Sequence, residues 1–201
     1  MLWTRNAHAK KFLDMAIEDL TQHNISIKVY RRNINSKFNI DGYFDDNLLQ
    51  LGVMKNSRWL ETFVHEYSHF LQWKSHETSF AAYYKYDYDP VRLVEMYIER
   101  KTGYDRKVQN AFRVIRRNEA SCDQIAAKLI RKYNLPIDIN NYRKEANRQI
   151  VFYHCVEHKR SWEPSYRFYG NTLRKMMPDR IQRSYVDRLP KQILETALDL
   201  F

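Results

Sequence analysis

The sequence is poor in the residues that interrupt regular structure, with only four glycines and five prolines among its 201 residues. Folds built from many short strands need frequent turns, and glycine and proline supply most of those turns. Their scarcity disfavours a loop-rich all-β fold and favours long helices. The hydrophobic fraction of 44% and the aromatic fraction of 14% are those of a globular chain with a core.

Cysteine is also scarce. The chain has only Cys122 and Cys155, and these do not form a C-x-x-C pair. A disulfide framework and a cysteine-based zinc ribbon are therefore excluded. Both residues fall in stretches with a helical pattern, so we expect two reduced, buried thiols in a reducing compartment.

Long apolar runs are missing as well. The first residues, Met1 to Asn6, lack the apolar stretch of a signal peptide, and no run approaches the length of about 18 residues that a membrane helix requires. We therefore expect a cytoplasmic protein with no membrane partner.

Basic residues outnumber acidic ones, and the formal net charge is +10. Such an excess favours acidic partners, including nucleic acid. Lysine and arginine are nevertheless spread over most of the chain, which is typical of solvated helix faces. We therefore do not favour nucleic acid as the partner. A basic chain rich in tyrosine and lysine suits a phage or a bacterium.

The spacing of apolar side chains predicts a small α+β fold. Helical periodicity covers residues 7–22, 59–73, 90–103, 105–133, 139–158, 163–177 and 191–201. Strand patterns cover residues 25–30, 38–44 and 47–54, the first of them half-buried. We expect a turn or bulge at Asp41-Gly42, a helix cap at Asn56-Ser57 and a loop within residues 75–90. The prediction is a single domain, residues 1–201, with a small three-stranded sheet and a predominantly α-helical remainder.

The most informative motif is His65-Glu66-Tyr67-Ser68-His69, which lies in the predicted helix 59–73. Residues four apart share one face of a helix, so His65 and His69 can direct two imidazoles at one metal ion. Glu66 is placed to act on a water molecule at that ion. Two neutral nitrogen ligands and a nearby general base are what a zinc hydrolase needs.

Such a site requires a third protein ligand. Peptidases with three histidine ligands continue the motif with glycine and histidine at the positions that Gln72 and Ser75 occupy here, and His76 is one residue out of register. That class is disfavoured.

Glu119 is the better candidate for the third ligand of one Zn²⁺ ion. It lies in Asn118-Glu119-Ala120-Ser121-Cys122-Asp123, within the predicted helix 105–133. Asp123 is four residues further on and shares its face. We expect Asp123 to accept a hydrogen bond from a ligand imidazole and so to fix the orientation of that ring.

The combination H-E-x-x-H with a later N-E-x-x-x-D resembles the gluzincin metallopeptidases. The stretch Glu119 to Ile130 is also similar to the ligand helix of the small intracellular ImmA/IrrE-type peptidases, in which small residues such as Ala126-Ala127 follow the ligand. The resemblance implies a minimal zincin-like domain with a catalytic core at about residues 7–135. It implies a zinc metallopeptidase, an endopeptidase, with His65, His69 and Glu119 as ligands. The resemblance does not extend to residues 136–201, for which we expect a helical C-terminal extension.

Other residues leave alternatives open. Peptidases of this class often place a Tyr or His where the oxyanion develops, and the possible stabilisers are Tyr153, His154, His158, Tyr166 and Tyr169. His154 and His158 form a second pair four residues apart, which indicates either another metal site or an amphipathic helix with one buried and one exposed histidine. The tyrosine-rich segment 83–88 indicates either packing over the sheet or stacking on single-stranded nucleic acid.

We therefore predict a zinc metallopeptidase that hydrolyses peptide bonds with Glu66 as general base. The peptide or protein substrate is expected to add as a strand to an exposed sheet edge, for which we predict the strand Leu48 to Val53. The alternative is a basic zincin-like nucleic-acid or protein-binding module without protease activity. A zinc hydrolase acting on a non-peptide amide is a third option.

Overall fold

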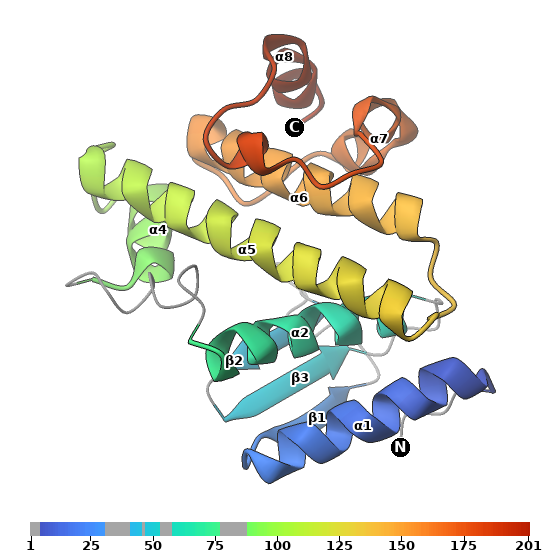
Figure 1. Ribbon diagram of the computed structural model, residues 1–201. Helices are drawn as coiled ribbons and strands as arrows, with labels where there is room; N and C mark the ends of the chain where they lie inside the picture. Colours follow the sequence, from blue (N-terminus) through green and yellow to red (C-terminus); the bar gives the residue numbers. More distant parts are fainter. Residues whose placement is uncertain (1–4, 31–40, 46, 53–57, 77–87) are drawn as a thin grey trace. The chain divides into compact units, whose positions relative to one another are not determined.

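The computed structural model describes residues 5–30, 41–45, 47–52, 58–76 and 88–201. These residues form mostly helices together with one three-stranded sheet (Figure 1), so the predicted small α+β fold is confirmed. The chain divides into two compact units. The first unit comprises Met1–Ser75 and Gln124–Tyr142, and the second unit comprises His76–Asp123 and Arg143–Phe201.

The first unit begins with helix α1, Ala7–Gln22, as predicted. The side chain of Asn6 caps it by accepting a hydrogen bond from the Ala9 N–H at 3.0 Å. Asn24 follows the helix with φ of 60°, a left-handed conformation that asparagine adopts more readily than most residues and that turns the chain toward the sheet. The buried face of α1 consists of Ala9, Phe12, Leu13, Ala16 and Leu20.

The sheet consists of β1 (Ser26–Tyr30), β2 (Gly42–Asp45) and β3 (Leu48–Gly52), in the order β1-β3-β2. Leu49 of β3 pairs with Ile27 in a parallel ladder and with Phe44 in an antiparallel one. The prediction that strand Leu48 to Val53 lies at an edge is therefore wrong. β3 is central because it pairs with β1 on one side and with β2 on the other, and its Leu49 and Leu51 are fully buried.

Two further expectations for the strands need correction. Gly42 was expected in a turn or bulge, but it begins β2 and pairs with Leu51. β1 is less buried than predicted, because Ile27 is half-buried while Val29 and Tyr30 are exposed. The parts of the predicted strands at residues 38–40 and 53–54 lie outside the described residues.

Helix α2, Trp59–Lys74, carries the histidine motif and confirms the helix predicted there. It lies against β2 and β3, and the ring of Phe44 meets those of Phe70 and Trp73 with centroids 6.0 and 6.4 Å apart. Ala126 and Ile130, near the end of helix α5 (Arg106–Lys132), belong to the same core. The predicted cap at Asn56-Ser57 lies outside the described residues.

The second unit contains α4 (Pro90–Ile98), the first part of α5 and most of α6 (Ile139–Lys159). Asp89 caps α4 by accepting the N–H of Val91 at 2.8 Å, as suits a helix that starts with proline. We predicted that α4 would reach Gly103, but it ends at Ile98 because Arg100 adopts a left-handed conformation with φ of 62°. The predicted loop within 75–90 falls largely on residues 77–87, outside the described part.

The predicted helix 163–177 is in fact two short elements, the 3₁₀-helix η1 (Tyr166–Tyr169) and helix α7 (Asn171–Met176). Gly170 separates them with extended backbone at ψ of 175°. A second 3₁₀-helix, η2 (Arg183–Val186), was not predicted, whereas the final helix α8 (Lys191–Leu200) was.

Both cysteines are free and buried, as the sequence predicts. No helix in the described ranges combines the length and the apolar character that crossing a membrane requires.

Candidate metal centre

Helix α2 brings His65 and His69 together on one face. Their ring centroids lie 4.8 Å apart with the ring planes at 88° to each other. Their ligand nitrogens lie within 4.8 Å of one another, and both side chains are half-buried. Two imidazoles held this close by one helix turn can share a single metal ion.

The orientation of the His69 ring has a local cause. Its Nδ1 lies 2.9 Å from Oε1 of Gln72, a residue with no exposed surface. When Nδ1 carries the proton and donates it to that oxygen, the lone pair of Nε2 is left for a metal. An acceptor behind a ligand imidazole fixes the tautomer in this way. This role of Gln72 was not predicted, although its position three residues after His69 is a signal for the contact.

Glu66 lies beside the strand β2. Only 6% of its surface is exposed. A Cβ atom built on Gly42 would stand 2.5 Å from Glu66 Oε1 and 2.5 Å from Thr62 Cγ2. The backbone of β2 therefore passes directly against the Glu66 carboxylate. This neighbour of Glu66 was not predicted, because the contact joins residues that are far apart in the chain.

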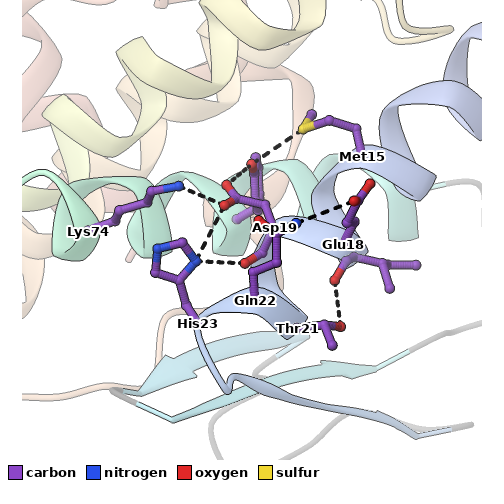
Figure 2. A network of polar contacts seen from close by, with 9 residues as sticks. Met15, Glu18, Asp19, Thr21, Gln22, His23 and Lys74 are labelled. Atoms are coloured by element: carbon purple, nitrogen blue, oxygen red, sulfur yellow. Dashed lines mark hydrogen bonds and ion pairs between the residues drawn. The ribbon is translucent and has the colours of Figure 1, made fainter.

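A polar network ties α2 to α1 within the first unit (Figure 2). Asp19 of α1 accepts hydrogen bonds from the Tyr67 hydroxyl at 2.8 Å and from Lys74 Nζ at 2.6 Å, and His23 Nδ1 lies 3.4 Å from its carboxylate. Burial alone would raise the pKa of Asp19, but Lys74 and Tyr67 outweigh it and lower the pKa. Burial and Asp19 together raise the pKa of Tyr67. The network thereby fixes the rotation of α2, on which His65 and His69 depend.

Glu119 and Asp123, the predicted site residues of α5, lie in the second unit, as does Cys122 between them. Cys122 and Asp123 are buried, with 0% and 4% of their surface exposed, and Glu119 is half-buried. Helical spacing places Glu119 one turn before Cys122 and Asp123, so all three lie toward one side of α5. A buried carboxylate and a buried thiol are both residue types that ligate zinc.

The predicted oxyanion stabilisers also lie in the second unit. His154 Nε2 donates a hydrogen bond to the carbonyl of Tyr185 at 2.6 Å. Burial, aided by the nearby Arg116, lowers the pKa of His154 to about 4, so its ring is neutral at pH 7. His158 is exposed, so the pair has the pattern of an amphipathic helix.

The tyrosines named with them differ in exposure. Tyr153 is half-buried and packs against the rings of Phe152 and Trp162. Tyr166 and Tyr169 are 87% and 50% exposed. The tyrosine-rich segment 83–88 falls mostly outside the described residues, which resume at Tyr88.

Comparison of the chain with protein-family models, with curated proteins and with solved structures finds no significant match.

Proposed function

We propose that this protein is a zinc metallopeptidase that cuts peptide bonds within chains. The observation that carries the proposal is the pair His65 and His69 on one turn of α2, with the buried carboxylate of Glu66 between them in sequence. The donor set fits zinc, because the contact of His69 Nδ1 with Gln72 leaves the Nε2 nitrogen for the metal. When bound, zinc would supply a Lewis acid that polarises the scissile carbonyl and lowers the pKa of water.

In this proposal Glu66 moves the protons. Its carboxylate accepts a proton from the attacking water and then delivers it to the nitrogen of the departing amine.

Glu119 is the proposed third ligand. The register of α5 supports it, because Ala126 follows Glu119 by seven residues, about two turns, on the same side of the helix. Ala126 packs in one core with Phe63 and Val64, which directly precede His65. Cys122 is the competing ligand, since its buried thiol lies on the same side of α5. Asp123 is proposed to accept a hydrogen bond from a ligand imidazole.

The substrate is proposed to lie along β2, in place of the predicted β3. Gly52 N–H donates to the Asp41 carbonyl at 2.7 Å, so Gly42 and Phe44 occupy the non-hydrogen-bonded positions of the β2–β3 ladder. Their own N–H and C=O groups therefore point away from β3. No strand among the described residues pairs with β2 on that side. A peptide in extended conformation can add there by backbone hydrogen bonds, next to Glu66.

The test combines metal analysis with hydrolysis. We expect purified protein to contain one zinc ion per chain and to cleave fluorescently labelled casein. Glu66→Gln should keep the zinc but lose activity by about 100-fold or more, as expected for removal of a general base. Wild-type protein that holds zinc and cleaves neither casein nor a peptide library would overturn the proposal.

Zinc content of single variants identifies the ligands. His65→Ala and His69→Ala should each lose the metal, whereas His158→Ala, a change at an exposed histidine, should retain it. Glu119→Ala should also lose zinc and Cys122→Ser should not. The opposite result for Glu119→Ala and Cys122→Ser would identify Cys122, and not Glu119, as the third zinc ligand.

The net charge of +10 supports one alternative, a nucleic-acid-binding module without protease activity. Such a module would bind single- or double-stranded DNA with an affinity that falls steeply with salt. Its binding would survive Glu66→Gln, which separates this function from hydrolysis.

A further inference from the structure

The closest approach to the Glu66 carboxylate comes from the backbone of Gly42. A Cβ atom at this position would lie 2.5 Å from Oε1 and 2.7 Å from Cγ of Glu66. Both distances are under 3.0 Å, a separation that real Cβ atoms essentially never show. Any residue other than glycine must therefore displace Glu66, or β2 must move away from α2.

The lack of room for a side chain, and not the backbone conformation, explains why position 42 is a glycine. None of the glycines in the described ranges has a positive φ, so Gly42 adopts a backbone conformation open to other residues. Gly103 provides the contrast, because a Cβ built there meets nothing within 4 Å. The special property of position 42 is the missing side chain.

We propose that Gly42 is a positioning residue for Glu66, whose missing side chain lets the carboxylate stand against β2 in the orientation that proton transfer needs. The inference rests on the proposed function, since that function makes Glu66 the general base. Gly42 itself touches no reacting atom in this scheme and acts through Glu66.

Of the three atoms that a Cβ would strike, the two nearest are Glu66 Oε1 and Thr62 Cγ2, and they differ in how they can move aside. Oε1 is the end of a flexible side chain and can swing aside at little cost to folding. Thr62 Cγ2 belongs to a β-branched side chain with a stiff first torsion angle, and it also lies 2.5 Å from the added Cβ. Alanine at position 42 should therefore displace the Glu66 side chain, and the contact with Thr62 is relieved by a local shift of β2 or of Thr62 that leaves the fold intact.

The same substitution leaves the outward backbone groups of β2 in place. Alanine keeps the N–H and C=O that Gly42 directs away from β3, so substrate binding along β2 should persist. The expected signature of Gly42→Ala is therefore a fall in kcat with little change in KM. A loss of about 100-fold is the scale expected when a reacting group is misplaced by about 1 Å.

The experiment compares wild type, Gly42→Ala and the matched control Gly103→Ala. Three quantities are measured on each: zinc content, kcat and KM on labelled casein, and the ¹³C resonance of the Glu66 carboxyl group. The resonance is assigned by its disappearance in Glu66→Gln. We expect Gly42→Ala to keep its zinc, lose kcat and shift the Glu66 resonance, and Gly103→Ala to match wild type in all three.

Thr62→Ser in the Gly42→Ala background separates displacement of the carboxylate from displacement of the strand. It removes Cγ2 and leaves the clash with Glu66, so it should not restore kcat. Restoration would overturn the inference, as would a Gly42→Ala variant with wild-type kcat and an unshifted resonance.

Two readouts do not depend on catalysis. A nuclear Overhauser contact between the Gly42 Hα and Glu66 Hγ protons is expected in wild type, and its absence would overturn the inference even if Gly42→Ala failed to fold. A wild type without peptidase activity, combined with a Glu66 resonance that shifts only in Gly42→Ala, would overturn the proposed function and support the contact.

Discussion

The hydroxyl of Tyr67 donates a hydrogen bond to the carboxylate of Asp19 at 2.8 Å, across 48 positions of the sequence. Tyr67 directly follows Glu66 on α2, and Asp19 lies near the end of α1. The bond therefore holds the helix of the histidine pair at one rotation relative to α1. Lys74, also on α2, donates to the other oxygen of Asp19 at 2.6 Å and adds a second point of attachment.

Tyr67→Phe should lower the free energy of unfolding by about 1–2 kcal/mol. The change removes one hydrogen bond to a charged group, while Asp19 retains Lys74. Urea unfolding measures the effect. Tyr30→Phe, at an exposed tyrosine in the same unit, serves as the control and should have almost none. Equal losses in the two variants would contradict the role given to the Tyr67 bond.

Glu157→Gln should destabilise the protein by about 3–5 kcal/mol, because it leaves the buried guanidinium of Arg116 without its counter-charge. Arg116 Nη1 lies 2.5 Å from Glu157 Oε2, and the two side chains are only 6% and 9% exposed. Glu157 also accepts a hydrogen bond from the hydroxyl of Tyr104 at 2.6 Å.

The matched control for that change is Glu95→Gln, which breaks the exposed pair Arg92–Glu95 with side chains 55% and 43% exposed. Its loss should be about 0.5 kcal/mol or less. Thermal or urea unfolding of both variants tests the difference, and a small loss for Glu157→Gln would show that the buried pair contributes little.

His154 should make the protein acid-sensitive. Burial, followed by Arg116, lowers its pKa to about 4 from an ordinary value of 6.5, against the opposing effects of the Tyr185 carbonyl and Glu157. The unfolded chain then binds a proton between those two pH values and the folded chain does not. The stability contributed by the neutral ring is therefore present above about pH 6.5 and is lost as the pH falls toward 4. The total loss in the free energy of unfolding is about 3 kcal/mol.

His154→Gln tests this, because glutamine keeps an N–H donor for the Tyr185 carbonyl and does not titrate. Urea unfolding between about pH 7 and about pH 4 should show a smaller loss of stability in the variant than in wild type. Parallel pH profiles would contradict the assignment to His154.

At the proposed zinc site, Gln72→Leu should weaken metal binding by about 10- to 100-fold, since it removes the acceptor that orients the His69 ring. Gln72→Glu keeps an acceptor oxygen and should bind zinc much more tightly than Gln72→Leu. Competition with a fluorescent zinc chelator measures both affinities. Equal affinities in the two variants would show that the contact does not tune the metal site.

The sequence alone predicts the features that depend on neighbours in the chain. The pairing of His65 with His69 follows from helix geometry over four residues, and α1 and α4 start at Ala7 and Pro90, as predicted. The prediction of one helix over residues 163–177 was wrong at Gly170, because helical periodicity continues on both sides of the break.

Only the tertiary structure decided which strand is central, which residue lies against Glu66 and which groups form hydrogen bonds with Asp19 and His154. β3 is central because β2 and β1 pair with it from opposite sides, which no local pattern encodes. The proximity of Gly42 to Glu66 and the hydrogen bonds of Asp19 and His154 join residues distant in sequence. Local geometry determines a helix and the face its side chains share, whereas contacts between distant residues form only when the chain packs, so the packed structure is needed to see them.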